Sequence, residues 1–147
     1  MTVLVDTSVW SLALRRRPQH LNAEQQLVVA EWSELVREGR VQMIGPVRQE
    51  LLSGLRHKRQ FALLEKRLSA FPDNPIQTTD YLEAARFFNL LRERGITGAP
   101  IDLLICAVAR RRDWAIFALD EDFERYARIL PIRLHRVAPA KRYPPPL

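Results

Sequence analysis

The chain has 147 residues, of which 47% are hydrophobic and 27% charged. That suffices for one domain burying roughly two-thirds of the surface that its unfolded form exposes. No apolar run approaches the roughly 20 residues of a membrane span, and the first residues lack the basic flank and cleavage site of a secretory leader. We therefore expect a cytoplasmic protein without a membrane segment, whose single cysteine, Cys106, packs as a small hydrophobe.

The net charge of +6 points to an anionic partner. The basic residues are 20 Arg and only 3 Lys, and guanidinium groups bind phosphate through two parallel hydrogen bonds. An ordinary surface that merely uses arginine in place of lysine would have the same composition, and charge says nothing about fold. Nucleic acid is the favoured partner class.

The chain begins with a strand signal and a helix signal. Residues 2–5 are β-rich and end at Asp6, after which Thr7 or Ser8 can cap a short apolar helix. Asn22 and Gln25 have the spacing of a capping box, and a helical period follows as far as Gly39.

The remaining signals continue this alternation. In chain order they predict a strand over 41–44, a helix from Pro46 through Glu50 to about Leu55, a basic helix over 57–70, a helix from Thr79 to Gly95, a helix over 101–112, a buried strand over 115–119, a short helix over 122–127 and a strand over 132–134.

Strands that alternate with helices predict an α/β fold. We expect a single three-layer α/β/α domain over residues 1–138, with a mostly parallel sheet of four to five strands. The long helical stretch between the second strand and the strand at 115–119 exceeds a minimal crossover, which predicts a projecting helical arm. Residues 139–147 are too rich in proline to pack, and we expect a disordered tail.

Four carboxylates are expected at one edge of this sheet. Asp6 and Asp120 each follow an apolar strand directly, which places both at the carboxyl edge, where ligands bind in open α/β sheets. Asp102 lies in an apolar first helical turn and needs a partner there. Glu50 lies one turn after Pro46, on a helix that follows a strand, so its direction can match that edge.

Each of these acids has an ordinary explanation when taken alone. An Asp near a helix start favours the helix dipole, and an Asp after a strand commonly makes a turn. Four acids at one edge repel unless they share protons, pair with arginines or bind a cation, and a cation explains all four. Oxygen ligands alone favour Mg²⁺ or Mn²⁺ over zinc. His20, His57 and His135 have no ligand spacing, and glycine loops for nucleotides are lacking.

Four motifs follow one another along the chain: Val3-Leu4-Val5-Asp6-Thr7-Ser8-Val9-Trp10, Gln49-Glu50-Leu51-Leu52 after Gly-Pro, Asp102 opening an apolar helix, and Leu119-Asp120-Glu121-Asp122-Phe123. In these ordered motifs the chain resembles a PIN-domain ribonuclease, particularly the VapC-type toxins of type II toxin-antitoxin pairs.

The resemblance implies roles for these residues. Asp6, Glu50, Asp102 and Asp120 match the acidic quartet that binds Mg²⁺ or Mn²⁺ and catalyses hydrolysis, and Asp122 matches a frequent additional metal ligand. Thr7 or Ser8 matches the hydroxyl beside the first aspartate. The chain departs from the family at Ala118, where a Thr or Ser is usual two positions before the fourth acid.

The implied activity is endoribonucleolytic cleavage of RNA phosphodiester bonds by metal-assisted hydrolysis, as the toxin of a toxin-antitoxin pair. A small antitoxin and a homodimer are the implied protein partners. We expect the phosphate contacts to come from Thr7, Ser8, Arg15, Arg16 and Arg48. The segment Arg110 to Arg112 is equally explained as RNA contact or as favourable charge at a helix C-terminus.

Three rival functions remain open. The first is a non-catalytic RNA-binding or regulatory module on the same fold, although all four acids are present. The second is phosphoryl transfer through an aspartyl nucleophile at Asp120 or Asp122, for which the 25 residues after Asp122 leave little room. The third is a metal-dependent nuclease acting on DNA.

Overall fold

The computed structural model describes residues 1–137, and the expected tail over 139–147 lies outside them, as does the expected domain boundary at residue 138. A short 3-10 turn, Pro18–His20, separates the first two helices. The strands and α-helices are, in chain order, β1 (Val3–Val5), α1 (Thr7–Leu14), α2 (Ala23–Arg37), β2 (Val41–Gln42), α3 (Gly45–Leu52), α4 (Lys58–Leu68), α5 (Thr78–Glu93), α6 (Pro100–Arg112), β3 (Ala115–Phe117) and α7 (Asp122–Ala127).

The sheet is parallel and has the order β2-β1-β3. Val3 pairs with Val41 on one side and with Ala115 on the other. Every residue of β1 and β3 is buried, which explains why both strands are unbroken apolar runs rather than alternating ones. Because all three strands run the same way, their carboxyl ends meet at one edge.

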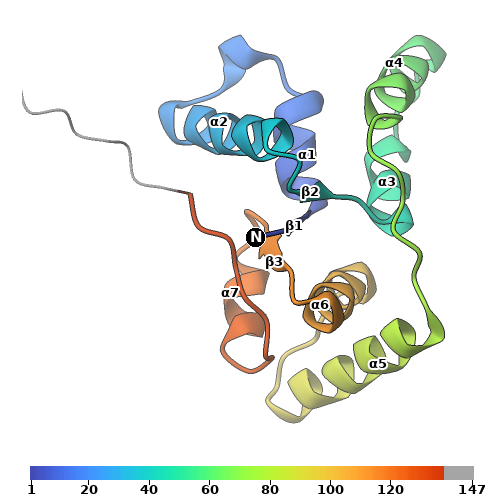
Figure 1. Ribbon diagram of the computed structural model, residues 1–147, viewed down its shortest axis with the longest axis vertical. Coiled ribbons are helices and arrows are strands. Elements are labelled where there is room, and N and C mark those ends of the chain that lie inside the picture. The colour runs from blue at the N-terminus through green and yellow to red at the C-terminus, as the bar shows by residue number, and fades with distance from the viewer. Residues whose placement is uncertain (138–147) are drawn as a thin grey trace, which may run out of the picture.

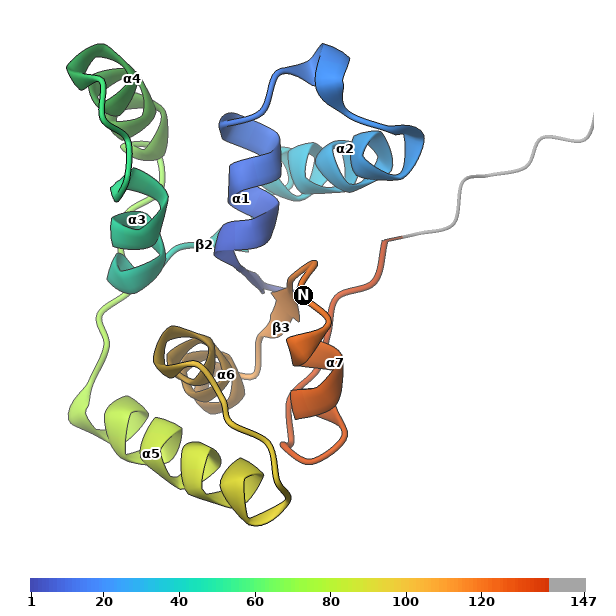
Figure 2. The same ribbon diagram turned by 180° about the vertical axis from the view of Figure 1, so that it is seen from behind.

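The helices form two layers around this sheet and an arm beside it. Figure 1 shows α1 and α2 on one side of the sheet, and α6 with α5 outside it on the other. Helix α3 packs against α1, and α4 packs against α3. Helix α4 stands away from the sheet in both views (Figures 1 and 2). The α/β/α architecture and the projecting arm are therefore as predicted.

The sheet is smaller than the four to five strands expected. The segment over 132–134 touches the sheet only at Leu134, which makes a single bridge to Ile116. Ile116 exchanges one hydrogen bond with Arg133 and one with His135, so the chain crosses β3 at one point without running along it. The strand expected over 41–44 ends at Gln42, since Met43 instead bridges to Asp73.

Helix starts follow the sequence signals with one correction. The capping box of Asn22 and Gln25 is present, and Pro46 and Pro100 lie in the first turns of α3 and α6. The cap of α1 was expected to be Thr7 or Ser8 and is Asp6, whose carboxylate accepts the Ser8 N–H. None of the described helices combines the length and apolar character that a bilayer span requires.

Helices α5 and α6 are joined by a buried ion cluster. Asp80 is fully buried and accepts hydrogen bonds from Arg111 Nε at 2.9 Å, from Arg112, and from the Gln77 amide at 2.8 Å. Burial alone would raise the pKa of Asp80, but the hydrogen bonds from Arg112, Gln77 and Arg111 lower it below its ordinary value. This cluster fixes the last turn of α6, the helix whose first turn carries Asp102.

We predict that Asp80→Asn lowers the free energy of unfolding by about 2 to 4 kcal/mol, because two guanidinium groups lose their shared carboxylate. Urea unfolding measures the change. Asp113→Asn is the matched control, since Asp113 is exposed and pairs only with Arg133 across the surface. It should change stability by no more than about 0.5 kcal/mol. Equal effects of the two variants would contradict a stabilising role for the buried cluster.

Candidate metal centre

Asp6 joins the first strand to the first helix at the carboxyl edge. Its backbone N–H donates to the carbonyl of Phe117 at 2.8 Å, which ties it to the end of β3. Its carboxylate is 5% exposed and accepts the Ser8 hydroxyl at 2.6 Å and the Ser8 amide at 3.2 Å. Burial raises the pKa of Asp6 although the hydrogen bonds from Ser8 and Thr7 lower it, and the charge of Glu50 raises it further.

Asp102 lies in the first turn of α6 and is partly buried. One carboxylate oxygen, Oδ2, accepts the hydroxyl of Tyr126 at 3.1 Å. Burial raises the pKa of Asp102 to about 6, the charges of Asp6, Asp120 and Asp122 act in the same direction, and the hydrogen bond from Tyr126 opposes them. The carboxylate therefore lies close to three others.

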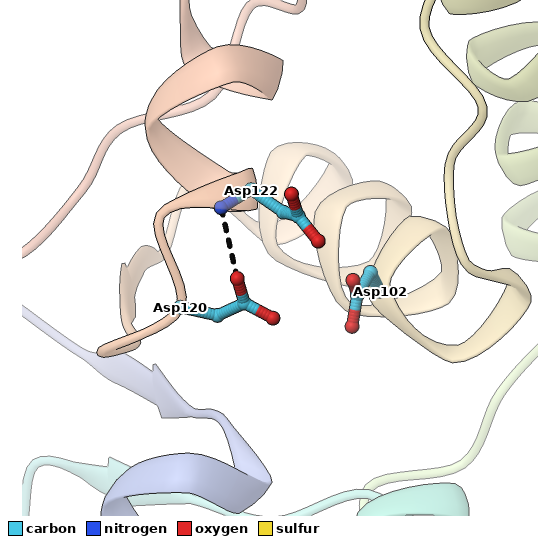
Figure 3. Close-up of side chains that lie close together, drawn as sticks. All are labelled: Asp102, Asp120 and Asp122. Atoms are coloured by element: carbon cyan, nitrogen blue, oxygen red, sulfur yellow. Dashed lines mark hydrogen bonds between the residues drawn. The ribbon is translucent and has the colours of Figure 1, made fainter.

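Asp120 and Asp122 complete this group from the turn that follows β3. One ligand oxygen from each of Asp102, Asp120 and Asp122 lies within 4.8 Å of the other two. Figure 3 shows the three side chains converging from α6 and from the start of α7, with the Asp122 amide donating to Asp120 Oδ1 at 2.9 Å. Asp122 also pairs with Arg125, one turn along α7, at 2.9 Å.

Glu50 is exposed on α3, and its charge raises the pKa of Asp6. Asp6 and Glu50 are outside the trio of oxygens within 4.8 Å of one another. The structure thus brings Asp102, Asp120 and Asp122 close together, with Asp6 near enough for its charge to raise the pKa of Asp102 and Glu50 near enough for its charge to raise the pKa of Asp6.

Positive charge is scarce at this edge. Among residues 1–137, no ion pair involves Asp6, Glu50, Asp102 or Asp120, and Asp122 has only the exposed Arg125. Like charges this close raise the free energy of the folded state unless a cation or shared protons compensate them. The donor set consists of carboxylate oxygens, which are the ligands that Mg²⁺ and Mn²⁺ take. The residues therefore fit a hard divalent cation.

The two hydroxyls expected to contact substrate have other positions. Ser8 Oγ donates to Asp6 and accepts the Leu119 amide at 3.0 Å, so it joins Asp6 to the turn that carries Asp120. Thr7 Oγ1 is buried and has no hydrogen-bond partner among the described residues. Ala118 offers no hydroxyl, but the amide of its neighbour Leu119 donates to the Ser8 hydroxyl. The Ser8 hydroxyl is therefore engaged within the protein, and its expected contact with substrate stays a prediction.

Of the expected phosphate contacts, Arg48 is engaged within the protein. Its guanidinium donates to Asp73 at 2.9 Å and to the backbone carbonyls of Leu68 and Phe71, which holds the end of α4 against α3. Few donors remain there for phosphate. Arg111 and Arg112 are likewise engaged, by Asp80.

Arg15 and Arg16 are exposed after the last turn of α1. Asp6 caps the first turn of the same eight-residue helix, so they lie roughly 12 Å along the helix from it. They are free to bind phosphate, but at a distance from the acids rather than beside them.

Sequence reasoning missed Tyr126. It lies four residues after Asp122, on the same face of α7, and only this helical spacing hinted that it faces the site. Its hydroxyl accepts the Ala99 amide at 3.3 Å and donates to Asp102. Burial and the Asp102 carboxylate raise its pKa well above the ordinary value, so the phenol stays protonated. Cys106, in contrast, is buried and has a raised thiol pKa, as expected of an inert core cysteine.

Comparisons with known proteins identify the family of this chain. The family model of the PIN domain matches residues 3–129. Two relatives are the VapC ribonuclease Mb1587 of Mycobacterium bovis and the ribonuclease VapC11 of Mycobacterium tuberculosis. Each is 30% identical over 131 residues, which is 86% of this chain and 92% of the relative.

Solved structures share the fold at lower identity. The FitAcB structure from Neisseria gonorrhoeae superposes with a TM-score of 0.71 and 22% identity, covering 91% of this chain and 97% of that chain. VapBC2 from Rickettsia felis, bound to a DNA fragment from the promoter, gives a TM-score of 0.71 and 16% identity, covering 92% and 98%. The family match over most of the chain, the relatives and the shared fold together establish that this chain belongs to the PIN-domain family.

Proposed function

We propose that the chain is an Mg²⁺- or Mn²⁺-dependent endoribonuclease and the toxin of a toxin-antitoxin pair. The observation that carries the proposal is the convergence of Asp102, Asp120 and Asp122, with one oxygen from each within 4.8 Å of the others, beside a buried Asp6. The relatives named as VapC ribonucleases support RNA as the substrate. An endoribonuclease of this kind meets its RNA in the cytoplasm, which is the location we propose.

In this proposal the more buried acids, Asp6 and Asp102, hold the cation, and an exposed acid accepts a proton from water. A bound divalent cation would polarise a phosphate oxygen and lower the pKa of a water molecule. Asp6 and Asp102 are held by hydroxyl groups and serve as the fixed ligands, with Asp120 and Asp122 beside them. Glu50 and Asp120 are exposed, and one of them accepts the proton of the attacking water.

The RNA would be held by arginines outside the acidic edge. Arg15 and Arg16 are exposed, and neither is in an ion pair among the described residues. Contacts at some distance from the scissile bond position the backbone rather than the reacting atoms. Arg48 is not part of this proposal, because its donors are engaged by Asp73 and by backbone carbonyls.

The arm offers surface for a protein partner. On α4, Phe61 is 38% and Leu63 is 55% exposed, and basic residues flank them. Two structures that share this fold carry the two-part names VapBC2 and FitAB, which supports a second protein as partner, and we propose that it is an antitoxin. A segment that folds on binding can cover such an apolar and basic surface. A homodimer is the second assembly we propose.

Cleavage of a mixed set of tRNA, rRNA fragments and single-stranded DNA by the purified protein tests the activity. We expect Mn²⁺-dependent cleavage of RNA that EDTA and the Asp102→Asn variant each reduce to background. Tight RNA binding without cleavage would favour the non-catalytic module instead. Cleavage of DNA in preference to RNA would contradict the assigned substrate.

Metal binding should stabilise the native state. At a Mn²⁺ concentration about 100 times the dissociation constant, we expect about 2.7 kcal/mol of stabilisation, a rise of several degrees in the melting temperature. Scanning calorimetry or fluorimetry measures it, with Asp102→Asn as the variant that should lose most of the gain. An identical melting curve with and without millimolar Mn²⁺ would contradict a metal site.

Burial of Asp102 and the like charges around it should make the metal-free protein less stable as pH rises. The folded-state pKa of Asp102 is raised to about 6, so between about pH 4 and pH 6 the native state binds more protons than the unfolded state. In EDTA, Asp102→Asn should therefore gain stability over the parent as pH rises from 4 to 7, by roughly 1 to 2 kcal/mol after allowance for solvent screening. A difference independent of pH would argue against a raised pKa.

A further inference from the structure

The hydroxyl of Tyr126 connects α7 to the start of α6 through two hydrogen bonds, one with the Ala99 amide and one with Asp102. The ring is 1% exposed and packs edge-on against Phe123, with centroids 5.4 Å apart. Its oxygen accepts the Ala99 amide at 3.3 Å, immediately before α6, and donates to Asp102 Oδ2 at 3.1 Å. Since Tyr126 follows Asp122 by one turn of α7, one face of this helix carries both residues.

The orientation of Asp102 depends on this contact more than on its backbone. An aspartate in the first turn of a helix can rotate about two side-chain bonds, and the α6 backbone alone does not select one orientation. Among the described residues, the Tyr126 hydroxyl is the only hydrogen-bond donor to the Asp102 carboxylate. It engages one oxygen and leaves the other without a protein donor.

We propose that Tyr126 is a positioning residue that fixes the Asp102 carboxylate in the orientation in which it converges with Asp120 and Asp122 on a divalent cation. The inference rests on the proposed metal-dependent function. A hydroxyl that only satisfied a buried backbone group would need the Ala99 amide and no carboxylate. The donation to Asp102 instead gives a prospective ligand the kind of outer hydrogen bond that orients carboxylates in metal sites.

The test replaces Tyr126 with phenylalanine, which removes the hydroxyl and keeps the ring. Mn²⁺ alone is titrated into the full chain and followed by electron paramagnetic resonance, which reports the free ion and the symmetry of the bound ion. We expect Tyr126→Phe to bind Mn²⁺ about 10 to 100 times more weakly, with an altered spectrum of the bound ion.

Two control variants separate positioning from general loosening. Tyr81→Phe removes a hydroxyl from a tyrosine that is 53% exposed on α5 and should bind Mn²⁺ as the parent does. Leu130→Ala truncates a buried side chain just after α7 and should lower the melting temperature in EDTA while the spectrum of bound Mn²⁺ is retained. Unchanged Mn²⁺ affinity in Tyr126→Phe would overturn the inference, as would an equal loss in Leu130→Ala at matched stability.

A measurement on the parent protein covers the case in which Tyr126→Phe does not fold. The chain has three tyrosines, and labelling them with ¹³C at Cζ gives one NMR signal for each. The signals lost in Tyr81→Phe and in Tyr143→Phe belong to those two residues, so the remaining signal is that of Tyr126. Saturating Mg²⁺ should shift that signal, and a Tyr126 signal that stays in place would overturn the inference. Absence of any Mn²⁺ binding by the parent would instead refute the proposed function, and the positioning role with it.

Discussion

Electrostatic repulsion among carboxylates at the carboxyl edge of the sheet is the constraint on which the site depends. Parallel strands deliver Asp6 and Asp120 to the same edge, and the first turn of α6 adds Asp102. The pKa of Asp102 is raised to about 6, first by burial of its carboxylate and then by the neighbouring charges of Asp6, Asp120 and Asp122. The backbone holds these carboxylates together, and their repulsion raises the free energy of the folded state. A bound hard divalent cation would offset this repulsion.

Asp6 and Asp102 are held by hydroxyl groups rather than by arginine or lysine side chains. Ser8 donates to Asp6 and also accepts the Leu119 amide, so one side chain links the first strand to the turn bearing Asp120. Tyr126, on α7, likewise donates a hydrogen bond to Asp102. A neutral donor orients a carboxylate while leaving its negative charge uncompensated, whereas an arginine in the same place would compete with a metal ion.

The arginines divide into those that build the fold and those left for partners. Arg111 and Arg112 are committed to the buried Asp80, and Arg48 is committed to Asp73 and to the chain at the end of α4. Arg15 and Arg16 remain exposed. A net charge of +6 therefore overstates the positive charge available to bind an RNA, because several guanidinium groups already form ion pairs within the protein.

The sequence by itself determined the order of most elements, the parallel sheet and which acids to expect at its carboxyl edge. Buried strands such as Val3–Val5 are continuous apolar runs, and caps such as Asn22 with Gln25 are local patterns, so both can be recognised along the chain. Only the tertiary structure decided which oxygens converge and which hydroxyl holds each acid. It also decided that Arg48 is internal and that residues near Leu134 touch β3 at a single bridge. Apart from the local bonds of Asp6 with Ser8 and of Asp120 with Asp122, these outcomes depend on contacts between residues 18 or more positions apart. Such distances are set by the packing of whole helices and leave no periodic signal in the sequence.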